Sequence, residues 1–308
     1  MAFYIVADGG GTKTLFRLIN GEKNTVASLR APGTNPVHIG VDRAVKTIEE
    51  SINLLITSAG LKQEDICRAA LFIPVLWRKK DVFDGRFPFP VELLSDTTAA
   101  VWAALGQEDG IVVLSGTGSF ASGRYNGRSL FVGGWGPYIG DEGSGFAIGR
   151  AALCHAARQY DSSALEDELT RLLKSSLGIR TIDELKVLQA DNAFLSPSRI
   201  ASLCPLVEEA AEHGSQAALK ILNHAACELG ELAHTCLRRL SVPEHQPVKL
   251  SVTGGAAVNN KLFLASCIKT LENRFPSAHV FSSARAPIEG AEDYVLKTTR
   301  KESIKGEL

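Results

Sequence analysis

The chain has 308 residues, of which 45% are hydrophobic, and its formal net charge at pH 7 is -1. This length and composition suffice for one large globular domain or two ordinary ones with full-sized cores. Because Lys and Arg are spread along the chain, nucleic acid and acidic membrane surfaces are not expected as partners.

The first hundred residues predict a meander of three strands followed by alternating helices and strands. An amphipathic helix from Val41 to Ile56 ends before Gly60, and Asn20-Gly21 is a turn between two strands. The expected strands are 3–7, 15–19, 25–30, 69–73 and 91–94, and the expected short second helix is 97–105. We assign this part the order βββαβαβα.

After Asp109-Gly110 the pattern of the first hundred residues begins again. Buried strands are expected at 111–114, up to 124 and up to 132, and later at 248–252 and 279–282, with helices at 258–271 and from 288. A long helical region interrupts this second copy, with a capping box at Thr181 and Glu184 and with Pro197 placed to open a helix. The sequence therefore predicts two similar α/β lobes.

The expected lobes are residues 1–106 and residues 107–288, the second with a helical insertion at about 151–240. The last helix, 289–308, is expected to pack back on the first lobe. If the two lobes share one architecture, their glycine turns should face a common cleft.

Two glycine turns have the chemistry of phosphate binding. The first, Asp8-Gly9-Gly10-Gly11-Thr12-Lys13-Thr14, matches neither the Walker A loop nor the dinucleotide fingerprint, because a strand follows it. Its glycines expose successive backbone N–H groups, which suit phosphate oxygens, and Asp8 could hold the water shell of Mg²⁺. Ser115-Gly116-Thr117-Gly118-Ser119 repeats this chemistry at the equivalent point of the second copy. The alternative for each is an ordinary hairpin turn.

The stretch Gly133 to Gly145 is the most unusual part of the chain, because it places glycines around Trp135, Asp141 and Glu142. Glycine lets the backbone approach a ligand closely, Trp135 could stack on a flat face, and the carboxylates could accept hydrogen bonds from hydroxyls. We interpret it as a binding element, and the alternative is a flexible surface loop. Thr253-Gly254-Gly255 is a third glycine turn, where a base or ribose could approach the backbone.

Asp96 follows the strand at 91–94 and opens the helix at 97–105. Asp is well suited to the helix N-cap, which is the simpler interpretation. A carboxylate at the carboxyl end of a sheet strand is also where a catalytic base for a hydroxyl would lie. Both interpretations stay open from the residues alone.

The cysteines and the N-terminus indicate an intracellular protein. The six cysteines form no C-x-x-C pair, and most lie in apolar helical patterns, so we expect neither disulfides nor a zinc site. The run Met1–Asp8 has no basic region and is too short for a signal peptide or a membrane span. We therefore expect a cytoplasmic protein.

Together these motifs resemble the BadF/BadG/BcrA/BcrD-type group of the sugar kinase, Hsp70 and actin superfamily, and within it the N-acetylglucosamine and glucosamine kinases. The resemblance rests on stretches in the same order along nearly the whole chain: 8–14, 33–36, 95–100, 115–119, 133–149, 210–214 and 253–255. It implies duplicated actin-like (ribonuclease H-like) α/β lobes with an ATP cleft between them, and ATP-dependent phosphoryl transfer to a hexosamine hydroxyl, the 6-hydroxyl. It also implies the cofactors ATP and Mg²⁺ and a homodimer, which the helical insertion could support.

The resemblance also implies roles for individual residues. Asp96 would be the catalytic base and Asp8 would position the metal. The expected substrate-binding residues are Asn35, Asp96, Ser119, Gly134, Trp135 and Asp141. The expected nucleotide-binding residues are Gly10, Gly11, Thr12, Lys13, Thr117, Gly118, Ala211, Gly254 and Gly255.

The chain departs from the family pattern beside the expected sugar pocket. Ser95 stands where Asn is usual, and Ile73-Pro74-Val75-Leu76-Trp77 replaces an Ala-Gly segment. These departures leave the identity of the sugar open. Two other functions are alternatives: an ATPase that activates a partner enzyme, which would need paired cysteines that the sequence lacks, and a non-catalytic nucleotide-dependent sensor.

Overall fold

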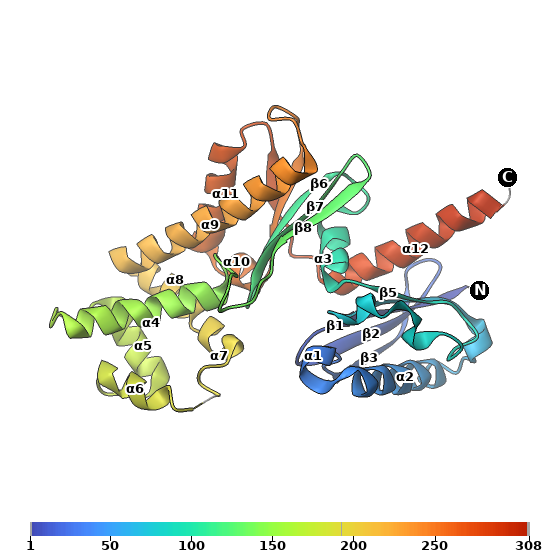
Figure 1. Cartoon of the computed structure of the whole chain (residues 1–308), viewed down its shortest axis with the longest axis horizontal. Helices are drawn as coiled ribbons and strands as arrows, with labels where there is room; N and C mark the ends of the chain where they lie inside the picture. The colour runs from blue at the N-terminus through green and yellow to red at the C-terminus, as the bar shows by residue number, and fades with distance from the viewer. Residues whose placement is uncertain (1, 192, 307–308) are drawn as a thin grey trace. The chain divides into compact units, whose positions relative to one another are not determined.

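The chain consists of two compact units, each built around one five-stranded sheet. The computed structural model describes residues 2–191 and 193–306 (Figure 1). The first unit comprises Met1–Gln107 and Arg285–Leu308, and the second comprises Glu108–Ala284. Each sheet is mixed, with helices packed on it.

The sheet of the first unit brings three parallel strand ends to one edge. Its strands are β1 (Phe3–Gly9), β2 (Lys13–Asn20), β3 (Thr25–Pro32), β4 (Ile66–Phe72) and β5 (Val91–Leu94), in the spatial order β3-β2-β1-β4-β5. Strands β1, β4 and β5 are parallel, and Asp8 pairs with Phe72, which pairs with Leu94. The residues after these three strands therefore meet at the same edge.

Helices cover both faces of this sheet because the strand residues alternate between them. Ile5 and Ala7 pack toward α2 (Val41–Ser58), whereas Tyr4 and Val6 pack toward α3 (Asp96–Leu105) and α12 (Pro287–Gly306). Figure 1 shows α2 on one face and α3 with α12 on the other. A short helix, α1 (Pro36–Ile39), precedes α2.

The connection from β4 to β5 is the loop expected from Pro88 and Pro90, and not the helix that the order βββαβαβα places there. Residues 73–90, all of which the structure describes, contain two 3-10 turns, η2 (Leu76–Arg78) and η3 (Lys80–Phe83). Pro74, Pro88 and Pro90 disfavour a helix here. Phe83 and Phe89 are buried instead and join the core on the α2 face.

The second unit repeats the sheet of the first. Its strands are β6 (Gly110–Ser115), β7 (Ser119–Tyr125), β8 (Arg128–Gly133), β9 (Lys249–Thr253) and β10 (His279–Ser282), in the spatial order β10-β9-β6-β7-β8. Strands β6, β7 and β8 are antiparallel, and β6, β9 and β10 are parallel. The order and directions are those of β3-β2-β1-β4-β5, so the predicted duplication is confirmed.

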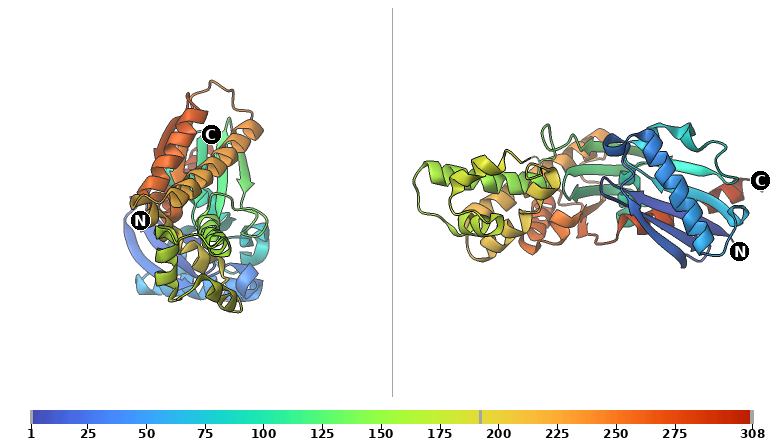
Figure 2. Two further views of the ribbon diagram at one scale, coloured as in Figure 1. Left: turned by 90° about the vertical axis from the view of Figure 1, so that its left-hand side faces the viewer. Right: turned by 90° about the horizontal axis from the view of Figure 1, so that it is seen from below.

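A group of helices lies between β8 and β9 in the sequence. They are α4 (Gly145–Asp161), α5 (Glu168–Leu177), α6 (Leu185–Leu188), α7 (Pro197–Ala201), α8 (Cys204–Glu212) and α9 (Gln216–Leu240), with the 3-10 turn η4 (Ile182–Glu184). The capping box of Thr181 and Glu184 is confirmed, on η4, and Pro197 is the first residue of α7. Helices α10 (Gly255–Val258) and α11 (Lys261–Arg274) follow β9. Figure 2 shows α9 running from this group along the sheet of the unit.

Three cysteines belong to the core. Cys204, Cys236 and Cys267 are buried, and burial raises the pKa of each thiol to about 12, so these thiols are unreactive at neutral pH. Cys67 and Cys227 are exposed. In the described part of the chain, no helix combines the length and apolar character needed to cross a membrane.

Candidate active site

The first glycine turn connects β1 to β2 and is fixed from two sides. Gly10 N donates a hydrogen bond to Lys13 O at 3.0 Å, which closes the hairpin. Gly10 O accepts from Thr34 N at 3.1 Å and from Asn35 N at 3.3 Å. Gly11, Thr12 and Lys13 are exposed. The structure thus brings the predicted phosphate residues together with Asn35.

Asp96 is not the N-cap of α3, so that interpretation is wrong. Ser95 is the N-cap, and its hydroxyl oxygen accepts from Thr97 N at 3.3 Å. The Ser95 hydroxyl also lies 3.3 Å from Asp96 Oδ1, to which it can donate. Asp96 is the first residue of α3, and its carboxylate is not needed to cap the helix because Ser95 does so.

The charge of the Asp96 carboxylate affects the ionisation of Asp8. Burial first and the charge of Asp96 second raise the pKa of Asp8, which reaches about 7 against the opposing effect of Lys13. Burial also raises the pKa of Asp96, although hydrogen bonds from Ser95 and from backbone N–H groups act in the opposite direction. Two partly desolvated carboxylates at one sheet edge form a region where a cation would be stabilised.

The two carboxylates of this pair are ligands of a kind that Mg²⁺ accepts. Mg²⁺ is usually bound by one or two carboxylates together with substrate phosphates and water. Among residues 2–191 and 193–306, no group of three or more His, Cys, Asp or Glu side chains could hold a metal ion alone. Asp8 and Asp96 would therefore need phosphate oxygens to complete the coordination.

In the second unit, the glycine turn between β6 and β7 is joined to the Gly133–Gly149 stretch. Ser115 Oγ donates to Gly143 O at 2.7 Å, and Ser119 Oγ donates to Glu142 O at 2.6 Å. A Cβ atom at Gly118 would lie 2.5 Å from Asp141 Oδ2, so only glycine lets the Asp141 carboxylate approach this closely. Ser115 was not among the predicted site residues. Only its hydrogen bond to Gly143 O shows that it fixes the Gly133–Gly149 stretch.

Asp141 occupies a strained and buried position within that stretch. Its φ is +62°, its exposed fraction is 7%, and it accepts from Gly136 N at 3.3 Å. Burial raises its pKa, against hydrogen bonds from Gly136 and Ser119 backbone groups. Trp135 is 73% exposed on the same loop, and Gly134 N donates to Ser119 O at 3.0 Å. The predicted residues Ser119, Gly134, Trp135 and Asp141 thus belong to one structure, whose indole is exposed to solvent.

A cavity of about 300 Å³ in the second unit lies beside both of its glycine turns. Thr117 and Gly255, both predicted, line it, and Gly254 packs so closely that a Cβ there would lie 2.4 Å from Ser115 O. The other lining residues are Gly116, Gly145, Ser198, Ala201, Ser202, Cys204, Pro205, Ala256, Asn259 and Asn260. The polar side chains among them suit the edge of a base or a ribose.

Sequence reasoning missed most of this lining. Ser198 and Ser202 reach the cavity because α7 packs against α4, whose first residue Gly145 also lines it, and no local sequence pattern predicts that contact. Asn259 and Asn260 directly follow α10, so their closeness in sequence to the Gly254-Gly255 turn could have indicated them as lining residues. Ala211 is not in the cavity wall: it is buried in α8 within the core.

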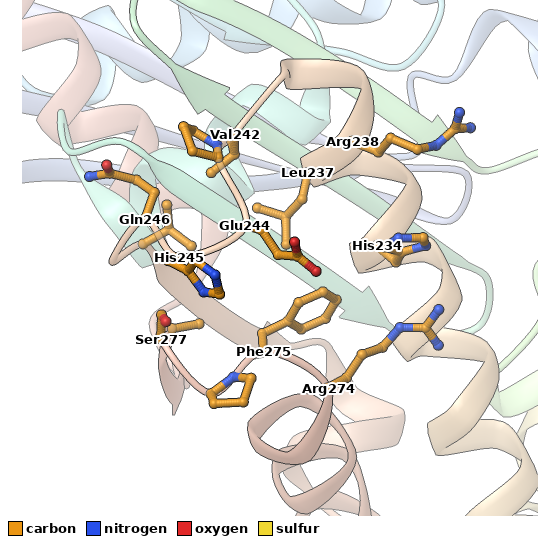
Figure 3. A pocket seen from close by; sticks show the side chains of 14 residues that line it. His234, Leu237, Arg238, Val242, Glu244, His245, Gln246, Arg274, Phe275 and Ser277 are labelled. Atoms are coloured by element: carbon orange, nitrogen blue, oxygen red, sulfur yellow. The ribbon is translucent and has the colours of Figure 1, made fainter.

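A larger cavity, of about 650 Å³, lies elsewhere in the second unit (Figure 3). It is bounded by the end of α9 and by the loops before β9 and β10, with Leu237, His245 and Phe275 among its side chains. Val248, just before β9, lines it, whereas Gly254 follows the other end of that strand. The cavity contains none of the predicted site residues and is at the opposite edge of the sheet from the glycine turns.

Residues 7–292 match the model of the BadF/BadG/BcrA/BcrD ATPase family. The chain belongs to this family. The match covers both glycine turns, Asp8, Asp96 and the whole Gly133–Gly149 stretch.

Relatives of this family member carry names of amino sugar kinases. The N-acetyl-D-glucosamine kinase of Dictyostelium discoideum is 27% identical over 306 residues, which cover 94% of this chain and 96% of that protein. The N-acetylmuramic acid/N-acetylglucosamine kinase of Clostridium acetobutylicum is 26% identical over 314 residues, which cover 94% and 97%. A structure from Chromobacterium violaceum, described as a candidate N-acetylglucosamine kinase, has a TM-score of 0.73 at 23% identity, with 96% and 98% covered. The structural match confirms the fold.

Proposed function

We propose that this BadF/BadG/BcrA/BcrD family member is an ATP-dependent kinase that phosphorylates a hexosamine, N-acetylglucosamine or glucosamine, at its 6-hydroxyl. The observation that carries the proposal is the pair of desolvated carboxylates, Asp8 and Asp96, beside the Gly10–Lys13 turn. The names of the relatives support a hexosamine as the acceptor.

Asp96 acts as the general base for the acceptor hydroxyl. Its pKa is raised by burial, which makes its carboxylate a better proton acceptor than an ordinary aspartate. Ser95 holds the carboxylate by a hydrogen bond and caps α3. Because phosphoryl transfer depends mostly on positioning and charge stabilisation, the base only has to be aligned with the hydroxyl and take its proton.

The glycine turns bind the nucleotide. Gly10, Gly11, Thr12 and Lys13 of the first unit and Thr117 with Gly118 of the second contact phosphate oxygens through backbone N–H groups and side chains. The cavity lined by Thr117, Gly255 and Asn259 takes the adenosine. A magnesium ion held by Asp8 would supply neutralisation of phosphate charge.

The acceptor is bound by the loop that carries Trp135. The exposed indole offers an apolar face for the sugar ring, and Asp141 accepts hydrogen bonds from sugar hydroxyls. Asn35 adds an amide: its Oδ1 accepts from Val37 N at 3.0 Å, which orients the side chain at the start of α1. Ser119 positions Glu142 and Asp141 through its hydroxyl and its backbone.

The experiment is ADP release from ATP with Mg²⁺, measured against a panel of hexoses and hexosamines beside a control without sugar. Strong stimulation by one amino sugar supports the kinase and identifies its acceptor. ADP release that no sugar changes would instead indicate an ATPase that serves a partner protein, and no release at all would favour a nucleotide sensor.

A homodimer remains part of the proposal, with the helices between β8 and β9 as the expected interface. Light scattering over a range of protein concentrations measures it directly. A mass near 33 kDa, that of one chain, at all concentrations would contradict the dimer.

A further inference from the structure

The loop that leads into α1 is fixed tightly on the first glycine turn. A Cβ atom at Gly33 would collide with Gly11 O, so only glycine allows this close approach of the two backbones. Thr34 Oγ1 lies 2.8 Å from Thr14 Oγ1, and both threonine side chains are completely buried. These contacts hold the loop and the turn together as one structure.

The loop brings the imidazole of His38 to the turn, although His38 was not among the predicted site residues. His38 N donates a hydrogen bond to Asn35 O at 3.1 Å, which fixes its backbone in α1. A Cβ atom at Gly11 would lie 3.2 Å from both Cδ2 and Nε2 of His38, so Gly11 Cα is within about 5 Å of Nε2. The Nε2 edge of the ring therefore faces the turn.

The glycine at position 11 is explained by space and not by backbone conformation. Its φ is outside the left-handed region, so other residues could adopt this backbone. A side chain here would instead crowd the His38 ring and cover the neighbouring backbone N–H groups. Gly11 and His38 are both exposed, so one ligand can reach the backbone and the ring together.

The turn and the ring carry hydrogen-bond donors that the protein itself does not use. Within residues 2–191 and 193–306, the N–H groups of Gly11 and Thr12 donate to no acceptor, and the His38 ring forms neither a hydrogen bond nor an ion pair. Lys13 adds a positive charge on the same turn. Phosphate oxygens accept several such donors at once.

The charge that opposes a phosphate here is that of Asp8, at the end of β1, on which Lys13 acts electrostatically. A magnesium ion held by Asp8, as proposed above, would neutralise that repulsion. Asn35, three residues before His38, is proposed to bind the sugar. The phosphate that is transferred must lie nearest the acceptor, so the position of His38 beside Asn35 favours the γ-phosphate.

We propose that His38 is a further nucleotide-binding residue, whose Nε2–H donates a hydrogen bond to the γ-phosphate of ATP beside the N–H groups of Gly11 and Thr12. An imidazole with a proton on Nε2 donates in its neutral and in its protonated form. This inference rests on the proposed kinase function and adds a residue to its phosphate site.

The test measures the Kd of ADP and of AMPPNP, a non-hydrolysable ATP analogue that retains the γ-phosphate, by calorimetry with Mg²⁺. His38→Phe keeps a flat ring without a donor, whereas His38→Gln replaces the ring and restores a donor. His38→Phe should raise the Kd of AMPPNP about tenfold and leave that of ADP within about twofold. His38→Gln should recover most of the lost affinity.

His245→Phe is the matched control. His245 is also exposed and forms no ion pair in the described part of the chain, but it lines the larger cavity, away from the glycine turns. This variant should change neither Kd. Both phenylalanine variants should melt within about 2 °C of the wild type, because both histidines are exposed.

Activity gives a second readout. In the sugar-stimulated reaction, kcat/KM for ATP should fall about tenfold in His38→Phe, while KM for the sugar stays within about twofold of the wild type. A structural disturbance of the loop would instead change the sugar KM as well, because Asn35 belongs to the same loop.

Three results would overturn the inference: an unchanged Kd of AMPPNP in His38→Phe, tighter binding of AMPPNP by that variant, or equal losses of affinity for AMPPNP and ADP. The proposed function fails in a different way. Wild-type protein that binds both nucleotides but releases no ADP in response to any sugar would contradict the kinase, and the two Kd values would still decide the role of His38. Wild-type protein that binds neither nucleotide would contradict both.

Discussion

Ser95 and Asp96 are adjacent in the sequence but have separate roles at the start of α3. The Ser95 side chain caps the helix, a role for which Asp is equally suited, so the residue types alone could not assign it. The structure shows that Ser95 is the N-cap of α3, and burial raises the pKa of the neighbouring Asp96. Asp96 therefore keeps the character expected of a base.

Asp96→Asn should remove most phosphoryl transfer while preserving both substrate sites. The amide has nearly the same shape but cannot take a proton, and general-base catalysis contributes about 10²- to 10⁴-fold. We expect kcat to fall in that range, with KM for ATP and for the sugar within about threefold of the wild type. Asp84→Asn, an exposed aspartate of the same unit, is the control. A kcat that survives in Asp96→Asn would remove Asp96 as the base.

Asp8 makes stability depend on pH. The folded protein binds the Asp8 proton more tightly than the unfolded chain, since the pKa rises from 3.8 to about 7. Stability therefore falls as pH rises through that interval, without nucleotide or metal. Asp8→Asn should raise the free energy of unfolding by about 1–2 kcal/mol at pH 8, after allowance for solvent screening, and change it little at pH 4.

Urea unfolding at the two pH values measures this difference. The same variant should lose Mg²⁺-dependent activity, because its amide is a weak ligand for the ion. A variant that is less stable than the wild type at pH 8 would contradict the account of Asp8.

Trp135→Ala should weaken binding of the sugar. The indole is 73% exposed, so its removal leaves the core intact, and a lost stacking contact of about 1.4 kcal/mol corresponds to a tenfold higher KM. Tyr138→Ala is a matched control, because Tyr138 is 81% exposed on the same loop but has no proposed sugar contact. Equal effects of the two substitutions on KM would exclude a specific role for Trp135.

The glycine turn between β6 and β7 is the element on which the second unit's site depends. Its two serines hold Glu142 and Gly143 by their hydroxyls, and Gly118 makes room for the Asp141 carboxylate. The sequence indicated a phosphate turn here, but the link to the Gly133–Gly149 stretch depends on contacts across more than twenty residues. No local pattern predicts such contacts.

Gly118→Ala should disrupt this turn. The added methyl would lie 2.5 Å from Asp141 Oδ2, so the turn or the carboxylate must move, at a cost of about 1–3 kcal/mol. We expect a lower melting temperature and a KM for the sugar raised about tenfold or more. Gly116→Ala is the control for stability, because the nearest atom to its Cβ is 3.6 Å away. If both variants melt alike, the close approach of Asp141 has no energetic consequence.

The segment 73–90 shows that local residues predict this connection better than the repeated order does. Pro88 and Pro90 predict a loop before β5, whereas the order βββαβαβα places a helix between β4 and β5. The burial of Phe83 and Phe89 in this loop depends on tertiary packing, which short-range periodicity does not report. The positive φ of Val75, +63°, arises in this segment and was not predicted either.

At the scale of the whole molecule, the duplication of the α/β unit was predictable because the same pattern of strands and turns occurs twice in the sequence. Each copy has a meander of three strands with a glycine turn after the first, and the structure repeats one strand order in both units. The helices between β8 and β9 were predicted as a helical region, but the position of α7 beside the cavity of about 300 Å³ was not. Sequence reasoning therefore gave the fold and the residues of the turns, but not the cavity wall.

In the proposed reaction, a phosphoryl group passes from ATP to an amino sugar. Phosphorus NMR of a reaction with ATP, Mg²⁺ and N-acetylglucosamine follows every product at once. We expect sugar 6-phosphate and ADP in equal amounts, with neither formed by Asp96→Asn above a small fraction of the wild-type rate. Inorganic phosphate that accumulates at the same rate with and without sugar would contradict the proposed kinase reaction.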